Sequence, residues 1–276
     1  MKRNYFLGLL LLSVFTIISG GCSDEENTPL SFYEKAYEIP IHGTRYIGVK
    51  SGSGDYSILS GNSGLFSASK EEGWSNPAGM ILVRGLLTGE STLAVTDNQT
   101  GETISLTIKV TDNYEVLRVS DLYWNGSTMI KSEHPVLSKA PFLFLVNNNS
   151  RDVYFADDNG EKTITSNGLK IQGKGNYSFA MEDGKPYLTL IYPADENGQL
   201  TDATLAVSTP HKFQITQCSE FFLHRLDEYL NLGWETIAKD YSDDEVGLAI
   251  TMEEVESGCK LEGKLEEVEI PVGVLN

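Results

Sequence analysis

The sequence is short of positive charge. Its 276 residues include 39 Asp and Glu but only 21 Lys and Arg, and the formal net charge at pH 7 is −18. Nucleic acids are bound through Lys and Arg that neutralise phosphates, so this balance argues against a nucleic-acid partner. It also disfavours a basic-patch contact with anionic lipid. The acidity favours colloidal solubility and weak non-specific adhesion.

Recognisable motifs for catalysis or metal binding are also scarce, although acidic residues are abundant. No two histidines have the spacing that a helix or strand uses to present two metal ligands. The four histidines are His42, His134, His211 and His224. No serine has the flanking glycines of a hydrolase nucleophile elbow. The acidic segments 157–159 and 195–197 coincide with predicted turns, which explain their composition without calcium. We therefore expect no enzyme activity, no metal and no cofactor.

Apolar runs are too short for a membrane-spanning helix, which needs about 18 or more residues. The longest run, residues 5–18, follows two basic residues and ends at the small residues 19–21. This order predicts a secretory signal peptide over residues 1–21.

Cys22 follows directly after the predicted cleavage site. The arrangement resembles the lipobox of bacterial lipoproteins, which implies that the Cys22 thiol is diacylated, for example with palmitate. Two or more acyl chains hold a protein stably on a bilayer. Ser19 departs from the lipobox pattern, where Leu, Val or Ile is usual, so ordinary secretion with an unmodified Cys22 is the alternative.

The residues after the cysteine are Ser23, Asp24, Glu25 and Glu26. They resemble the acidic export signal of Bacteroidota lipoproteins, which implies a location on the outer face of the bacterial outer membrane. A solvated acidic linker is the alternative explanation. We expect residues 22–31 to be a lipidated tether whose acyl chains are the contact with the membrane.

If lipid occupies Cys22, Cys218 and Cys259 remain as an even pair. A disulfide between them would close a loop of about 40 residues and contribute about 4 kcal/mol on the chain-entropy model. Two separate buried thiols are the alternative.

Short strands separated by turn residues fill residues 32–112. Residues 103–110 alternate between polar and apolar side chains, residues 91–96 form a second strand, and residues 97–101 form the hairpin loop between them. Further strands are expected at residues 36–41, 45–50, 56–60, 65–69 and 80–86. About seven strands with turns every 8–12 residues are typical of a β-sandwich.

A family resemblance lies in the same region. Val83-Arg84-Gly85-Leu86, Gly89, the segment 93–97 and the alternation over 104–110 resemble the second half of bacterial immunoglobulin-like domains. The resemblance covers about a quarter of the chain. It implies a spacer or adhesion-type sandwich and brings no catalytic residues.

Residues 113–276 predict a larger antiparallel β-rich (α+β) domain of unrecognised family. The apolar run 142–146 predicts a strand buried on both faces, and the turn signals at 158–160 and 183–184 predict hairpins. One amphipathic helix is expected over about residues 219–240, with Ser219 as its N-cap. Gly233 indicates either close packing or a break before Trp234. The expected fold is thus mainly β, with an Ig-like sandwich first.

For function we expect a non-enzymatic binding or structural accessory module with a glycan or surface-protein ligand. Trp74, Tyr123 and Trp124 are candidate ligand-stacking aromatics, although burial in the core is the commoner fate of Trp. A surface polysaccharide hydrolase and a surface-filament subunit are the alternatives. A cleft with two carboxylates beneath a Tyr or Trp would favour the hydrolase.

Overall fold

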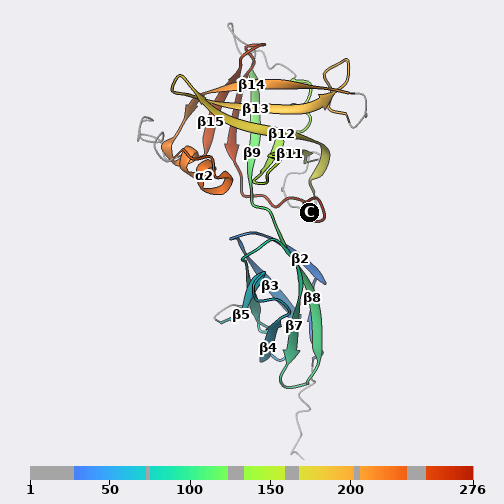
Figure 1. The fold of residues 1–276 in the computed structure, drawn as a ribbon. Coiled ribbons are helices and arrows are strands. Elements are labelled where there is room, and N and C mark those ends of the chain that lie inside the picture. Colours follow the sequence, from blue (N-terminus) through green and yellow to red (C-terminus); the bar gives the residue numbers. More distant parts are fainter. Residues whose placement is uncertain are drawn as a thin grey trace, which may run out of the picture.

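The computed structural model describes residues 28–72, 75–123, 134–158, 168–201, 206–234 and 247–275, with residues 120–123 by backbone alone. It shows two bodies of mainly β structure, a smaller N-terminal one and a larger one that carries a helix (Figure 1). The predicted fold class is therefore confirmed. The signal peptide, the lipidation site Cys22 and the export signal at residues 23–26 lie outside the described residues and stay predictions.

The N-terminal body is a sandwich of two four-stranded sheets, with the orders β1-β3-β6-β5 and β2-β8-β7-β4. Its strands are β1 (Ser31–Phe32), β2 (Ala36–Pro40), β3 (Thr44–Ser51), β4 (Tyr56–Ser60), β5 (Phe66–Glu71), β6 (Met80–Gly85), β7 (Gly89–Asp97) and β8 (Thr103–Thr111). β2 runs parallel to β8, and the remaining pairs are antiparallel.

The sandwich core follows from the alternation of buried and more exposed residues along its strands. In β8, Leu106 and Ile108 are buried and Thr107 between them is not, while Leu93 and Val95 of β7 are buried in the same core. Each fully buried aliphatic side chain contributes roughly 1.5–3 kcal/mol. The local pattern is therefore enough to specify which face of each strand points inward.

The larger body is a closed antiparallel barrel in which eight strands follow one another in chain order and the last pairs with the first. Its strands are β9 (Tyr114–Tyr123), β10 (Phe142–Val146), β11 (Asp152–Asp157), β12 (Lys170–Glu182), β13 (Lys185–Ala194), β14 (Val207–Cys218), β15 (Ala249–Glu254) and β16 (Lys260–Leu265). The sequence predicted an antiparallel unit but not its closure. Closure removes both sheet edges.

Bulges and glycines bend these strands into a barrel. The register shifts at three places, between Phe155 and Ala156, between Ile215 and Gln217, and between Glu262 and Gly263. A Cβ at Gly175 would lie 2.3 Å from the carbonyl oxygen of Ile191. Gly173 and Gly175 are both part of β12, where glycine allows close backbone approach.

β10 is buried on both faces, as predicted, and the structure shows why. Leu143 and Leu145 belong to the core inside the barrel. Phe142 and Phe144 form a separate buried cluster with Ile270 and other residues of the C-terminal tail, which we define as residues 266–275. The tail therefore covers the outer side of β10.

The helix α2 (Glu220–Leu230) closes the end of the barrel that faces the sandwich (Figure 1). Ser219 is its N-cap and accepts a hydrogen bond from Phe222 N at 3.0 Å, as predicted. The helix does not reach residue 240, because Asn231 adopts a left-handed conformation and ends it. Of the two explanations for Gly233, the break before Trp234 is the one confirmed. Within the described residues, no helix has the length and apolar character to cross a bilayer.

Cys218 and Cys259 are not joined by a disulfide, so that expectation is wrong. Cys218 pairs with Ile250 at one end of β15, whereas the Cys259 carbonyl accepts from Glu254 N at the other end. Four strand residues span about 13 Å, and a disulfide requires Cα atoms within about 7 Å. Both thiols are instead at least partly buried, as in the alternative considered.

Candidate functional site

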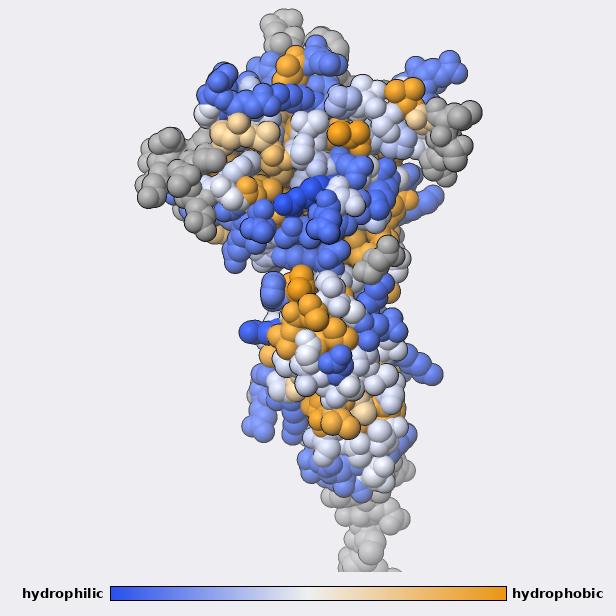
Figure 2. Space-filling view, in the orientation of Figure 1, coloured by the Kyte–Doolittle hydropathy of each residue, from blue (hydrophilic) through white to orange (hydrophobic). Residues whose placement is uncertain are grey.

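Within the part of the chain that the structure describes, two groups of polar side chains are candidates for a functional site. One is a cleft at the junction of the sandwich and the barrel, which we call the junction cleft. The other is a cluster of His134, His211 and Glu254 at the opposite end of the barrel. In the space-filling view the barrel surface above the junction is largely hydrophilic, and a hydrophobic patch lies on the sandwich just below it (Figure 2).

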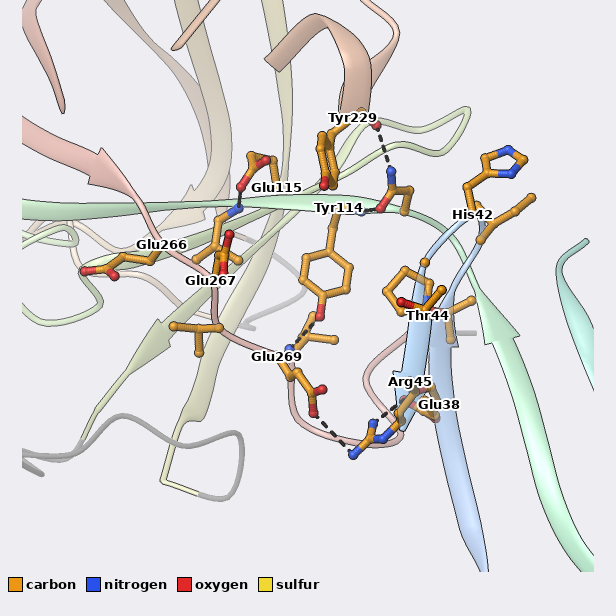
Figure 3. A pocket seen from close by; sticks show the side chains of 18 of the residues that line it. Glu38, His42, Thr44, Arg45, Tyr114, Glu115, Tyr229, Glu266, Glu267 and Glu269 are labelled. Carbon is orange, nitrogen blue, oxygen red and sulfur yellow. Dashed lines mark hydrogen bonds and ion pairs between the residues drawn. The ribbon is translucent and has the colours of Figure 1, made fainter. Parts of the chain in front are cut away.

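The junction cleft has a volume of about 690 Å³. Four segments far apart in the sequence line it, from both bodies and from the C-terminal tail (Figure 3). Its charged, aromatic and histidine side chains are Glu38, His42, Arg45, Tyr114, Glu115, Arg225, Glu228, Tyr229, Glu266, Glu267 and Glu269. Six glutamates thus face two arginines, which gives the cleft an acidic lining.

Local folding places these side chains. The turn between β2 and β3 presents His42, whose φ of 65° lies in the left-handed region that non-glycine residues rarely adopt. The start of β9 brings Tyr114 and Glu115 into the junction, and one side of α2 presents Arg225 and Tyr229.

An ion-pair network joins the barrel side of the cleft. Arg225 Nε donates to Glu115 Oε2 at 2.9 Å, and Arg225 Nη1 lies 3.4 Å from Glu267 Oε1. Burial raises the pKa of Glu115, and the hydrogen bonds and charge of Arg225 oppose the rise without cancelling it. The Arg225 guanidinium also lies over the Tyr229 ring, 5.3 Å from its centroid. These contacts thus hold the Glu115 and Arg225 side chains in place.

The tail connects the cleft to the sandwich. Arg45 pairs with Glu269 at 3.4 Å, and Gly273 N donates to Glu38 Oε1 at 3.1 Å. The Tyr114 hydroxyl accepts from Ile270 N at 3.0 Å, with its ring between β9 and the tail (Figure 3). Burial raises the pKa of Tyr114 to about 12, so this hydroxyl stays protonated at neutral pH.

Chemically, the cleft offers carboxylate acceptors, guanidinium donors and two tyrosine rings. Such groups recognise the hydroxyls and the apolar faces of polyhydroxylated ligands. Among the described acids of the cleft, Glu115 is the one whose pKa is raised. It is paired with Arg225, and its side chain is only 3% exposed. It is therefore poorly placed to transfer a proton to a bound ligand.

The second cluster is centred on Glu254. His211 Nδ1 donates to Glu254 Oε1 at 2.8 Å, and the Ser257 hydroxyl donates to Glu254 Oε2. Tyr192 stacks on His211 with ring centroids 4.6 Å apart. Burial alone would raise the pKa of Glu254, but the hydrogen bonds from His211 and Ser257 and the nearby His134 lower it.

We tested whether the three side chains fit a metal ion, since one ligand atom from each lies within 4.8 Å of the others. A histidine that binds zinc normally donates its second ring N–H to an acceptor. Nδ1 of His134 instead accepts from Val136 N at 3.2 Å and Leu137 N at 3.1 Å. The neutral ring therefore carries its proton on Nε2 and has no lone pair there for an ion. The arrangement fits a hydrogen-bonded network, and we do not assign it as a metal site.

The stacking candidates predicted from the sequence are not placed in either site. Trp74 and Trp124 lie outside the described residues, and only the backbone of Tyr123 is described, at the end of β9. These assignments stay predictions. Of the acidic turns, Asp195 uses Oδ1 to accept from Asn197 N and Gln199 N, in agreement with a turn role.

Sequence reasoning missed both polar sites. The cleft residues share no local motif, because four distant segments supply them. One signal for the other cluster was present: His134 precedes Pro135, and proline is favoured directly after the residue that caps a helical turn. That pairing marks His134 as a capping side chain.

Comparison with known proteins assigns this chain to no family. No protein-family model matches the sequence, and no curated protein matches it. Among solved structures the chain is similar to domains 4 and 5 of the S-layer protein SbsC, with 11% identity and a TM-score of 0.24, covering 30% of this chain and 50% of that one. Its similarity to SbsC domains 5–6 has 15% identity and a TM-score of 0.24, covering 67% of this chain and 98% of that one. For SbsC domains 4–9 the values are 13% and 0.24, and the chain spans only 28% of that structure. Because these TM-scores are so low, we transfer neither fold nor function from SbsC.

Proposed function

We propose that this chain is a lipid-anchored lipoprotein on the outer face of the bacterial outer membrane and acts there as a non-enzymatic binding module. The anchor at Cys22 and the outward location rest on the sequence signals. The binding role rests on one structural observation, the junction cleft of about 690 Å³ between the two bodies. Ligand sites occur preferentially at domain junctions and typically have volumes of about 300–1,000 Å³.

A glycan is the ligand class that the lining favours. Sugar hydroxyls can pair with carboxylate and guanidinium groups at once, and sugar ring faces pack on aromatic side chains. The cleft presents Arg225 and Tyr229 from α2 opposite the sandwich side, where Arg45 and His42 lie. A ligand in the cleft would therefore contact both bodies.

In this proposal the sandwich acts as a spacer. It is the first folded body after the predicted tether, and the barrel follows it along the chain. The sandwich then holds the cleft away from the membrane surface, where extracellular polymers can reach it.

A polysaccharide hydrolase is the second candidate. The observation in its favour is a cleft that contains carboxylates beside Tyr114 and Tyr229. A glycosidase needs a proton-donating acid and a second carboxylate on opposite sides of the scissile bond. The pairing of Glu115 with Arg225 weakens that assignment, so binding without hydrolysis is the preferred function.

The test uses the soluble chain from Thr28 onward, which retains the buried Leu30 of the sandwich core. We expect a glycan array to give a ligand, and calorimetry to confirm its affinity. Val272→Trp should abolish binding by filling the cleft, because Val272 lines it and is 60% exposed. Val255→Trp is the matched control, since Val255 is 56% exposed and follows β15 at the far end of the barrel.

Equal loss of binding in both valine variants would place the ligand elsewhere. If the chain binds no glycan but captures a defined surface protein, the ligand is a protein and the glycan proposal is wrong. Release of shortened sugars from a bound polysaccharide would favour the hydrolase.

A further inference from the structure

Residues 134–140, which we call the mouth turn, fill the barrel end opposite α2. β9 ends and β10 begins at this end, because Phe142 pairs with Arg118 while Val146 pairs with Tyr114 near the junction. Val136, Leu137 and Ala140 of the mouth turn belong to the same core cluster as the side chains inside the barrel. The turn therefore closes the barrel core on this side.

His134 holds the mouth turn together. Its side chain accepts hydrogen bonds at Nδ1 from the backbone N–H groups of Val136 and Leu137, at 3.2 and 3.1 Å. These two donors are the ones that a capping side chain normally satisfies at the start of a helical turn. The residue is only 6% exposed, so water cannot readily replace the histidine. The closed turn thus requires an unprotonated Nδ1.

Charged and titratable groups face His134 from two neighbouring strands. Glu254 lies on β15 and His211 on β14, and Tyr192 of β13 stacks on His211. On the mouth turn itself, Lys139 is directed to Gln199 and not to the histidine. The Glu254 carboxylate is already shared between His211 and Ser257. Its charge attracts a proton to His134, while His211 opposes it.

We propose that the mouth turn is a latch that acid releases. A proton that binds His134 can only add at Nδ1, because the neutral ring already carries its hydrogen on Nε2. Nδ1 then becomes a donor and faces the Val136 and Leu137 N–H groups, so both hydrogen bonds are lost. The turn opens and exposes the end of the barrel core. No other group needs to change its charge for this to happen.

The direction of the pH dependence follows from the environment of His134. Burial lowers its pKa to about 4, and Glu254 only partly opposes this effect. In the open turn the histidine regains its ordinary pKa of about 6.5. The closed state therefore has its full stability above about pH 6.5 and loses it as the pH falls towards 4. Between these limits the opening constant rises by somewhat less than tenfold per pH unit, which gives about 40-fold from pH 6.5 to 4.5.

The test is hydrogen exchange of the Val136 and Leu137 amides in the chain from Thr28 onward, between pH 7 and 4.5 and corrected for intrinsic exchange rates. Wild type should lose protection about 60-fold. His134→Asn is the matched variant, because its side-chain oxygen can accept the same two hydrogen bonds without titrating. Its protection should stay nearly constant. Equal losses in both proteins, or no loss in wild type, would overturn the latch.

A second measurement needs no substitution. ¹⁵N NMR of the wild-type histidines at neutral pH should show His134 with its proton on Nε2. On acidification its Nδ1 should gain a proton together with shifts of the Val136 and Leu137 amides. A proton on Nδ1 at neutral pH contradicts the proposal.

Discussion

The sandwich and the barrel differ in what they bury. The described sandwich core is apolar apart from Asp97 and Thr111, whereas the barrel buries five polar or charged residues. In the barrel these are Glu115, His134, Asp152, Ser219 and Glu254. Several of them lie where the barrel ends are closed, at α2 and at the mouth turn. Closing a barrel end with helix and turn segments brings backbone polar groups inside, and these groups need partners.

Two buried carboxylates, Asp97 in the sandwich and Glu115 in the barrel, illustrate this difference between the two bodies. Burial disfavours ionisation of Asp97, but hydrogen bonds from Ser53, Gln99 and Thr100 outweigh it and lower its pKa. For Glu115, burial prevails over its pairing with Arg225, and its pKa is raised. Asp97 is thus stabilised as an anion by backbone donors of its own turn and by the backbone and hydroxyl donors of Ser53. Glu115 has one backbone donor, Val116 N at 3.1 Å, and otherwise depends on the Arg225 side chain from α2.

The largest expected effect tests whether the two bodies unfold separately. Phe66 in the sandwich and Phe155 in the barrel are both fully buried. Truncation of either to Ala should cost about 3–5 kcal/mol, through lost burial and the cavity left behind. Hydrogen exchange with increasing urea should show that each variant destabilises mainly its own body. Equal destabilisation of both bodies would mean that the C-terminal tail couples them into a single unit.

The next effect concerns Glu115. Arg225→Met should cost about 3 kcal/mol at pH 7, since it leaves a buried carboxylate without its partner. The pKa of Glu115 rises further in the variant, so its folded state gains a proton that the unfolded state lacks. The cost should therefore shrink as the pH falls towards the ordinary Glu value of about 4.3. Urea denaturation of wild type and of the Arg225→Met variant at pH 7 and 5 measures this cost in unfolding free energy.

The matched control replaces both partners. Glu115→Leu combined with Arg225→Met gives an apolar pair of similar volume, which should recover most of the loss. A penalty for Arg225→Met that is the same at both pH values would show that lost packing, not the unpaired charge, is responsible.

For Asp97 the cost of substitution should also shrink on acidification, but only at lower pH. Its carboxylate accepts from Ser53 N at 2.8 Å and from Gln99 N at 2.9 Å. Asp97→Asn should cost about 1–3 kcal/mol at pH 7, because an amide group cannot accept all of these bonds. Since the folded pKa is lowered, wild type loses this advantage as the pH falls below about 3.9. Denaturation curves from pH 7 to 3 should converge, and a constant difference would refute the assignment.

The sandwich was predictable because its information is local. The alternation over residues 103–110 became β8, and the turn at residues 97–101 has its glycine at a φ of +75°. The five-residue apolar run 142–146 likewise indicated a strand buried on both faces, which β10 confirms. In each case a few adjacent residues determine both the conformation and the buried face.

Closure of the barrel was not predictable in the same way. It depends on the pairing of Leu265 with Leu117, between the two ends of the domain. The junction cleft was equally hard to predict from the sequence, because the segments that line it meet only where the tail returns to the sandwich. His134 shows the same limit, because its approach to His211 and Glu254 depends on how the mouth turn meets β14 and β15.

The smallest expected effect concerns the two thiols that the sequence suggested as a bridge. With Cys218 and Cys259 at opposite ends of β15, neither body gains stability from a covalent link. A reducing agent should therefore leave the unfolding midpoint of the chain from Thr28 onward unchanged. Burial raises the pKa of Cys218 to about 11, so its thiol should react slowly with a disulfide reagent in the folded state at pH 8. Two thiols per chain should react at once in denaturant. Fewer than two, or a midpoint that falls on reduction, would show that the cysteines pair after all and that the barrel is held by more than packing.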